Sequence, residues 1–315
     1  MAKPDRVVER STSPWNFLIM CVPKPDGTWR PVIDYRGINK ITVKEQWTMT
    51  RTDEAFDALH KARFISVVDC TSGYWQIPLH ENSKQYTAFT GEDGRYQYNS
   101  LPMGTTNAAP TFQRNMEVML TGLLWKSCIV YIDDIIIYSN TFEEHKRHLK
   151  EVLERLQKAN IVLKPSKCKL VRKEVEYLGH IVGNSELKTI PKNVEKILAT
   201  KLPKTLTEVR AFCNMAGFYG KFIKDYVHIT QLLSKLMGLP GKKKKIKLDE
   251  EAEKAFYKIR EAIASQPVLA LPDFSKPFGI RTDASAYVTE AVMFQINEER
   301  EERPCLLYTS DAADE

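Results

Sequence analysis

The chain has 315 residues, of which 43% are hydrophobic and 27% charged, with a formal net charge of +6 and a pI near 8.8. These values predict a soluble, globular protein with a sizeable core and about two or three domains. The mild excess of positive charge suits a polyanionic partner. No apolar run approaches the ~18 to 20 residues of a membrane span, and residues 1–10 are charged where a signal peptide needs an apolar core.

We therefore expect a cytoplasmic or nuclear protein without a membrane partner. The six cysteines are scattered and include no Cys-x-x-Cys pair, which argues against a zinc site and a disulfide framework. We expect them to be reduced and mostly buried.

The first predicted element is a β-hairpin with strands over residues 17–22 and 29–35. Lys24, Arg30 and Arg36 surround its turn and exit. Such cations could hold a triphosphate, arginine through a bidentate fork and lysine as a point charge. The alternative is a solvated basic hairpin.

A short helix over residues 52–59 leads into an apolar strand, residues 64–69, that ends in Asp69. Gly73 then permits a tight turn that presents Tyr74. An aspartate at a strand end is a usual place for a metal ligand, and a helix N-cap is the alternative interpretation of Asp69.

Strands over residues 86–89 and 96–98 flank a turn and are expected to join the same sheet as residues 64–69. The loop over residues 101–110 is rich in small residues, so another backbone or a ligand can approach it closely. It opens a helix predicted over residues 111–121.

Two adjacent carboxylates, Asp133 and Asp134, separate the apolar runs 129–132 and 135–138. Two strands with a two-residue connection predict a β-hairpin with both aspartates at its tip. Like-charge repulsion and partial desolvation would raise one carboxyl pKa unless a cation neutralises the pair, and a divalent metal is the natural partner. The alternative is a solvated Asp-Asp turn.

Thr141 is expected to cap a helix that carries His145 and His148. We assign no metal site to these histidines because no carboxylate or cysteine partner accompanies them. A strand over residues 161–163 and a hairpin over 175–182 follow. The predicted strands and helices thus alternate around one sheet, which predicts the α+β class.

The sequence then predicts three short helices, over residues 192–198, 205–219 and 230–236. A basic run, residues 242–245, is typical of an exposed linker. A helix over residues 249–264 follows, and a new sheet is expected to begin at residue 268.

Together, these segments resemble the reverse transcriptase of gypsy-class LTR retrotransposons over roughly residues 10 to 300. The stretch SPWNF…VPKPDGTWRPVIDYRGIN is similar to the fingers, and VVDCTSGYWQIPL is similar to polymerase motif A. LPMGTTNAAPTFQ resembles motif B and YIDDIIIYS resembles motif C. Several motifs in this order and at this spacing are highly specific.

The resemblance implies a right-hand polymerase fold, with fingers, a palm built on an antiparallel sheet and a helical thumb, followed by the start of an RNase H-like α/β domain. The implied boundaries are 1–185 for fingers and palm, 186–240 for the thumb, 241–268 for a connecting linker and helix, and 269–304 for the truncated RNase H-like part. Residues 305–315 resemble a translated sequencing adapter and are expected to be non-native.

The resemblance also implies that Asp69, Asp133 and Asp134 hold two Mg²⁺ ions, for which Mn²⁺ could substitute, and catalyse nucleotidyl transfer from a dNTP to a primer 3′-hydroxyl. The implied partners are an RNA template, a DNA or tRNA primer, dNTPs and the remaining Pol segments: RNase H, integrase and protease. The implied location is a cytoplasmic virus-like particle with a nuclear phase.

Further roles follow from the same resemblance. Lys24 and Arg30 would hold the triphosphate, and Tyr74 would lie under the sugar and exclude a 2′-hydroxyl. Met103 would face the nucleotide, although retroviral enzymes carry glutamine and many gypsy elements phenylalanine at this place. Lys167 would protonate pyrophosphate.

Residues Tyr177, Leu178, Gly179 and His180 resemble the primer grip. Asp283 resembles the first RNase H metal ligand, whose partners would lie downstream of residue 315, so we predict no RNase H activity. Residues 47–50 replace a usual proline-rich segment. The alternative to an active polymerase is a catalytically silent, nucleic-acid-binding remnant of a Pol polyprotein.

Overall fold

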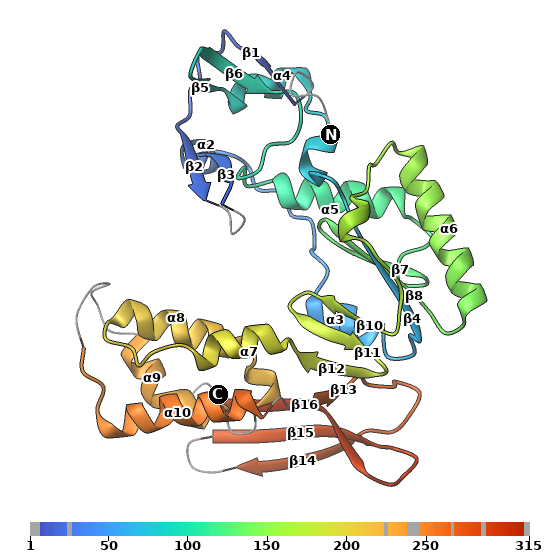
Figure 1. The fold of residues 1–315 in the computed structure, drawn as a ribbon, viewed down its shortest axis with the longest axis vertical. Coiled ribbons are helices and arrows are strands. Elements are labelled where there is room, and N and C mark those ends of the chain that lie inside the picture. The colour runs from blue at the N-terminus through green and yellow to red at the C-terminus, as the bar shows by residue number, and fades with distance from the viewer. Residues whose placement is uncertain are drawn as a thin grey trace. The chain divides into compact units, whose positions relative to one another are not determined.

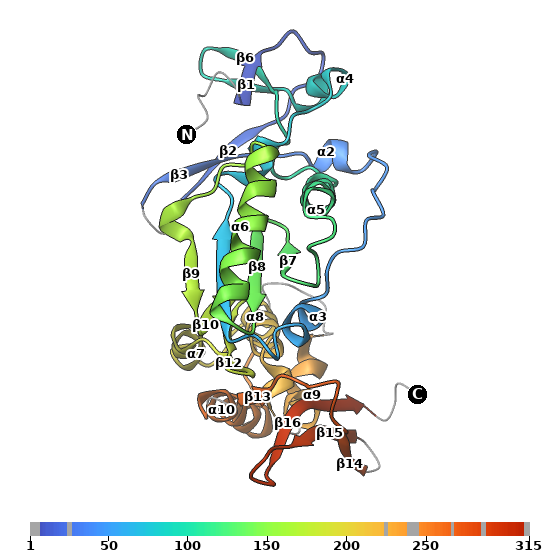
Figure 2. The ribbon, with the colours of Figure 1, turned by 90° about the vertical axis from the view of Figure 1, so that its right-hand side faces the viewer.

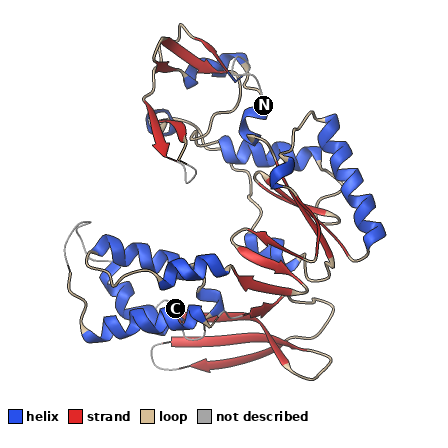
Figure 3. Ribbon diagram, in the orientation of Figure 1, coloured by secondary structure: helices blue, strands red, loops and turns tan. Residues whose placement is uncertain are grey.

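Helices and strands are mixed along the whole chain (Figure 3), which confirms the predicted α+β class. The computed structural model describes residues 7–23, 27–223, 226–237, 246–265, 268–284 and 288–311. Two compact units are formed, the first from residues 1–51 and 64–172 and the second from residues 52–63 and 173–315. None of the described helices is both long and apolar enough to cross a lipid bilayer.

The first unit contains a four-stranded antiparallel sheet. Its strands, in spatial order, are β7 (Cys128–Tyr131), β8 (Asp134–Ser139), β4 (Phe64–Asp69) and β9 (Lys169–Arg172). Helix α6 (Phe142–Lys158) runs across β4 and β8 (Figure 2). Helix α5 (Ala108–Met119) packs against β7.

The core of this unit explains why the strands contain uninterrupted apolar runs. Val68, Ile135 and Ile137 are at most 1% exposed and share a cluster with Phe112 of α5 and Val152 of α6. Apolar residues at alternate positions of a strand point to one face, and here that face is covered by helices. The strand ends that carry Asp69 and Asp134 therefore extend from a buried apolar core.

Helix α6 begins as its sequence predicts. Thr141 Oγ1 accepts a hydrogen bond from the Glu144 N–H at 3.3 Å, and Glu144 Oε2 accepts one from the Thr141 N–H at 3.2 Å. This reciprocal capping box confirms Thr141 as the N-cap. The strand predicted at 161–163 is not formed, because Leu163 makes only an isolated bridge to Cys70.

Two smaller sheets complete the first unit. One has the order β1 (Val8–Arg10), β6 (Gly94–Tyr98) and β5 (Phe89–Gly91), and the other pairs β2 (Ile19–Pro23) with β3 (Trp29–Ile33). The first unit also contains short helices: α2 (Arg36–Asn39), η1 (Gly73–Gln76), α4 (Glu81–Lys84), η2 (Gln85–Thr87) and η3 (Pro165–Lys167).

The prediction that residues 86–98 join the sheet of β4 is wrong. Strand β6 pairs instead with β1, through a register that places Val8 opposite Tyr98. Strand propensity marks a segment as extended but carries no information about a partner almost ninety residues away in sequence, which explains the error. The described chain has five sheets rather than one.

The second unit begins with α3 (Thr52–Asp57) and contains a sheet of order β10 (Glu174–Tyr177), β11 (His180–Gly183), β12 (Glu186–Thr189) and β13 (Val268–Ala270). Its helices are α7 (Pro191–Leu198), α8 (Leu206–Gly217), η4 (Gly220–Phe222), α9 (Tyr226–Met237) and α10 (Glu250–Ala264) (Figure 1). The expectation that residue 268 opens a new sheet is wrong, because β13 pairs with β12.

Residues 173–185 lie in the second unit. The reason is their backbone pairing, since β11 forms its ladder with β12.

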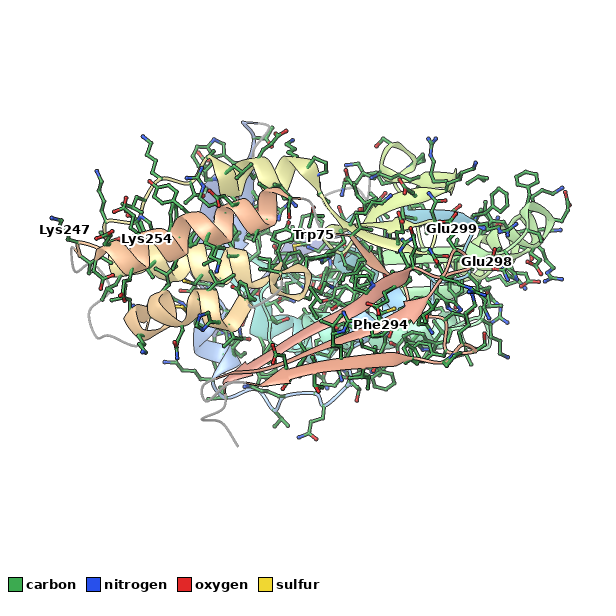
Figure 4. The ribbon with its side chains drawn as sticks, turned by 90° about the horizontal axis from the view of Figure 1, so that it is seen from below. Trp75, Lys247, Lys254, Phe294, Glu298 and Glu299 are labelled. Carbon is green, nitrogen blue, oxygen red and sulfur yellow. The ribbon has the colours of Figure 1, made fainter. Side chains whose placement is uncertain are left out.

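The basic run at 242–245 lies outside the described residues. Lys247 and Lys254 point outward beside the start of α10 (Figure 4), where Lys254 pairs with Glu250 at 2.7 Å.

The last sheet has the order β14 (Gly279–Ala284), β15 (Val288–Ile296) and β16 (Glu302–Asp311). Phe294 lies on this sheet (Figure 4) and stands opposite Gly279 in the register, where a Cβ atom would collide with its ring. Glycine at 279 is therefore required by the close approach of an aromatic side chain. Glu298 and Glu299 lie at the loop between β15 and β16.

Candidate active site

Asp69 and Asp134 are direct partners in the pairing of β4 with β8. Residues opposite each other in an antiparallel pair point to the same face, with Cβ atoms about 4.5–5.5 Å apart, and two like charges there are destabilising. The two strands thus bring together carboxylates that are 65 positions apart in the sequence. A positive charge nearby would relieve the repulsion between these two carboxylates.

The loop between β7 and β8 consists of Ile132 and Asp133, and Tyr131 pairs with Asp134. This corrects the expectation that both aspartates form the tip, because Asp134 is already the first residue of β8. Ile132 has φ +55° and is the only loop residue with a positive value, which is the sign pattern of a type II′ turn. Glycine is usual there, so the β-branched Ile132 is strained.

The electrostatics of the site follow from this crowding. Burial raises the pKa of Asp134, and the negative charges of Asp133 and Asp69 raise it further, while Lys167 opposes the rise. Lys167 Nζ donates a hydrogen bond to Asp69 Oδ2 at 2.9 Å, and this bond is the main reason why the pKa of Lys167 is raised. The backbone supports the pair, since the Lys164 N–H donates to the Asp69 carbonyl at 2.9 Å.

Tyr74 lies close to the same carboxylates. Burial raises the pKa of its hydroxyl, and the charge of Asp133 contributes to the rise. Its ring stacks on Phe112, with centroids 5.2 Å apart and an interplanar angle of 25°. A Cβ atom on Gly73 would lie 2.9 Å from Phe112 Cζ, so glycine is needed for this stack to form.

Within the described part of the chain, no group of three or more His, Cys, Asp and Glu side chains is placed so that it could hold a metal ion. The donor chemistry at Asp69, Asp133 and Asp134 nevertheless fits Mg²⁺, which prefers oxygen ligands and is usually held by one or two carboxylates together with substrate phosphates. The ammonium group of Lys167 already pairs with one of these carboxylates, that of Asp69.

The other predicted nucleotide contacts lie in the first unit. Arg30 is exposed on β3 opposite Val22, and Met103 is 46% exposed in the loop before α5. Lys24 lies outside the described residues. Arg36 forms an ion pair with Asp34 at 2.6 Å, and the hydrogen bonds from Arg36 lower the pKa of Asp34 to about 2.

His145 and His148 are satisfied by serines rather than by a metal. Ser66 Oγ lies 2.7 Å from His145 Nε2, and Ser139 Oγ lies 3.1 Å from His145 Nδ1 and 2.8 Å from His148 Nδ1. Burial lowers the pKa of His145, which favours the neutral ring.

The predicted primer-grip residues and Asp283 lie in the second unit. Leu178 and Gly179 form the two-residue loop between Tyr177 and His180, with φ values of +46° and +80°, as a type I′ turn requires. His180 is 2% exposed and its Nδ1 lies 3.1 Å from the Leu178 carbonyl oxygen. Asp283 is exposed on β14, opposite Glu290.

Sequence reasoning missed Gln113, whose fully buried side chain contacts the aspartate loop from α5. The signal was present in the helix pattern, because Gln113 follows Phe112 on a face that also carries Met116. A buried polar side chain must find hydrogen-bond partners. A glutamine on the buried face of this helix could therefore have been named as a candidate site residue.

Comparison with known proteins agrees with this geometry. Residues 22–182 match the family described as reverse transcriptase (RNA-dependent DNA polymerase), and residues 248–314 match the RNase H-like domain found in reverse transcriptase. Two Drosophila melanogaster retrovirus-related Pol polyproteins are similar. That of transposon 297 is 38% identical across 92% of this chain and 28% of its own length, and that of gypsy is 35% identical across 92% and 30%.

Solved structures are similar as well. The foamy viral protease-reverse transcriptase dRH in complex with double-stranded DNA has a TM-score of 0.87 and 26% identity, covering 97% of this chain and 53% of that one. The same viral enzyme with an RNA/DNA hybrid has a TM-score of 0.85 and 25% identity, covering 97% and 40%. The chain spans about three tenths of the length of the curated relatives it matches. It belongs to the reverse transcriptase family and corresponds to the reverse transcriptase region of retrotransposon Pol polyproteins.

Proposed function

We propose that this chain is an RNA-directed DNA polymerase that extends a primer 3′-hydroxyl with dNTPs on RNA and DNA templates. The observation that carries the proposal is the register of β4 and β8, which sets Asp69 opposite Asp134, with Asp133 in the adjoining loop. The foamy viral enzyme, whose fold this chain shares, has been solved with double-stranded DNA and with an RNA/DNA hybrid. Both kinds of duplex arise when RNA is copied into DNA.

Reverse transcriptases are generally metal-dependent, and Asp69, Asp133 and Asp134 are the residues that would hold two Mg²⁺ ions, or Mn²⁺ in their place. Bound Mg²⁺ lowers the pKa of the attacking hydroxyl and neutralises charge on the triphosphate. The role of the chain is to hold three carboxylates in one place, where burial and mutual repulsion favour a bound cation.

Lys167 has a second role in this proposal. Its ammonium group is held beside Asp69, and the nearby carboxylates keep it protonated. In this proposal it gives a proton to the departing pyrophosphate. The structure thus supports Lys167, among several neighbouring lysines, as the general acid.

Tyr74 would select dNTPs. Its ring is immobilised by the stack on Phe112 and presents a rigid surface beside the carboxylates. A ribose 2′-hydroxyl would collide with such a surface, whereas a deoxyribose would fit. Arg30 and Lys24 would hold the triphosphate, and Met103 would contact the nucleotide without a hydrogen bond.

The proposed partners are an RNA template, a DNA or tRNA primer, dNTPs and the other Pol segments, with residues 177–180 gripping the primer. Template-dependent primer extension by the purified chain tests the polymerase function. With Mg²⁺ and dNTPs on an RNA template, we expect incorporation, and we expect D69N, D133N and D134N each to lose at least about a hundredfold in rate.

The matched control is E154Q, because Glu154 is an exposed carboxylate on α6 whose ion pair with Lys150 spans 3.9 Å. We expect it to keep the wild-type rate. Undiminished extension by D134N would refute the assigned site. Salt-sensitive binding of a primer-template without any incorporation would instead support the silent remnant.

A further inference from the structure

Ser66 carries a buried hydroxyl on β4, an inner strand of its sheet, and hydrogen bonds from two elements meet at its oxygen. Its Oγ accepts a hydrogen bond from the Val171 N–H of β9 at 2.9 Å. His145 Nε2, on the helix α6 that runs across the sheet (Figure 2), lies 2.7 Å from the same oxygen. Both Ser66 and His145 are 0% exposed. One serine oxygen therefore joins the edge strand β9 to the helix that covers the sheet.

The positions of the protons in this cluster follow from its acceptors. His148 Nδ1 lies 3.2 Å from the Tyr138 carbonyl oxygen, which can only accept, so this nitrogen carries a proton. The same N–H lies 2.8 Å from Ser139 Oγ, and Ser139 therefore gives its own proton to His145 Nδ1, 3.1 Å away. The neutral ring of His145 then carries its proton on Nε2 and donates it to Ser66. The Ser66 oxygen is thus fixed in place from the helix.

Strand β9 depends on this oxygen because it does not pair regularly with β4. Between the pairs Ile65–Arg172 and Val67–Lys169, two residues of β9, one of them Val171, stand opposite the single serine of β4. Such a bulge leaves the extra residue outside the regular ladder. Val171 has φ +52°, a conformation that a β-branched residue keeps only when its surroundings hold it there. The hydrogen bond from its own N–H to the buried serine is such a constraint.

The bulge follows closely on the segment that carries Lys167. Strand β9 begins at Lys169, two residues after Lys167 at the end of η3. Lys167 Nζ donates to Asp69 Oδ2 at 2.9 Å. Without its anchor at the bulge, β9 can shift along β4, and a shift of one residue moves the chain by about 3.3 Å. Lys167 would then lie one residue out of place relative to Asp69.

We propose that Ser66 is a positioning residue, which fixes the bulge of β9 and through it the place of Lys167 beside Asp69. The inference rests on the proposed polymerase function for its kinetic consequence but not for its structural one. Ser66 acts through Lys167 and not on the nucleotide itself, so its loss lowers turnover without weakening nucleotide binding.

Four variants test the proposal in the full chain. S66A removes the hydroxyl group. S66T and S66V form a pair of the same shape, in which only threonine offers a hydroxyl oxygen to the Val171 N–H. S127A is the control, because Ser127 is a similarly buried serine, in the loop before β7, whose hydroxyl donates to the Leu123 carbonyl at 3.3 Å.

The first measurement is hydrogen exchange at the Val171 amide, which requires no activity. We expect exchange to be about tenfold faster in S66A than in the wild type, because the amide of an edge strand is then open to water, and unchanged in S127A. Unchanged exchange in a folded S66A would overturn the proposal. If S66A does not fold, the pair of equal shape decides: faster exchange in S66V than in S66T supports the proposal, and equal exchange contradicts it.

The second measurement is single-nucleotide primer extension in a double-mutant cycle with K167M. We expect S66A to lower kcat about three- to tenfold while KM for the dNTP stays within about threefold, and S66T to keep most of the wild-type rate. In the K167M background, S66A should change kcat by less than about twofold, because the group that Ser66 positions is already gone. An equal loss in both backgrounds would show that Ser66 does not act through Lys167.

The two measurements separate this inference from the proposed function. A wild-type chain that incorporates nothing would refute the polymerase function, whereas the exchange measurement would still decide whether Ser66 holds the bulge. A wild-type chain that is active, with Val171 exchange unchanged in S66A, would keep the polymerase function and refute the role of Ser66.

Discussion

Lys167 Nζ lies 2.9 Å from Asp69 Oδ2, so that an ammonium group pairs with the carboxylate at the end of β4. The contact joins two parts of the proposed chemistry. Asp69 would hold Mg²⁺ in the proposed enzyme, and Lys167 beside it would give a proton to the pyrophosphate. In the proposed function, Lys167 would therefore compete with a cation for Asp69 and would act as the general acid.

The first prediction concerns this pair. We expect K167M to lower kcat about ten- to a hundredfold, through loss of the acid, and to lower the Mg²⁺ concentration needed for half-maximal activity, because nothing competes for Asp69. Steady-state primer extension across a Mg²⁺ titration measures both effects. Exposed Lys164 lies three residues earlier, and K164M should change neither value. If K164M changed both values and K167M changed neither, Lys164 rather than Lys167 would be the general acid.

The second prediction concerns sugar selection. Removing the Tyr74 ring from its stack on Phe112 opens space beside the carboxylates. We expect Y74A to raise kcat/KM for rNTPs relative to dNTPs by about ten- to a hundredfold. Y74F is the control, because it keeps the ring and should leave the ratio within about threefold. An unchanged ratio in Y74A would exclude Tyr74 as the steric selector.

The third prediction concerns acid sensitivity of the second unit. Burial lowers the pKa of His180 to about 4, and the nearby charge of Lys221 adds to the effect. In the unfolded chain the ring takes up a proton near its ordinary pKa of 6.5. Between those values the unfolded state binds more protons than the folded state, so this contribution to stability falls as the pH drops from about 6.5 to about 4.

The slope from this one group approaches about 1.4 kcal/mol per pH unit. Urea unfolding at pH 7 and pH 5 measures it. We expect H180F, which keeps a ring against Phe218 and Phe56, to lose that part of the pH dependence. Exposed His228 provides the control variant H228Q, which should keep the wild-type slope. Equal slopes in H180F and wild type would contradict the prediction.

The fourth prediction concerns the turn between β10 and β11. Leu178 has φ +46°, in the left-handed region where asparagine is tolerated far better than leucine. We expect L178N to raise the free energy of unfolding by up to about 1 kcal/mol. The urea midpoint at constant m-value checks this. L178A keeps the unfavourable backbone conformation and should bring no gain, so an equal gain in L178A would point to lost side-chain contacts instead.

The sequence alone determined those features that depend on neighbouring residues. The strand from Phe64 to Asp69 and the α6 N-cap at Thr141 lie where they were predicted, and a hairpin with a two-residue connection forms at Asp133, shifted by one residue from the predicted loop. Propensity, apolar runs and capping hydrogen bonds are local, and so the chain reveals them position by position. The ordered motifs also identified the family.

Only the tertiary structure decided the partners of these elements. It paired β6 with β1 and β13 with β12, and it placed Asp134 inside β8 opposite Asp69 rather than at the tip. Strand partners and register depend on contacts between residues distant in sequence, which a local pattern does not encode. The hydrogen bonds of Gln113 are of the same kind. Its buried amide lies on α5, and only the tertiary structure brings it against the outer side of β7, where it bonds to Val130 and Ile132.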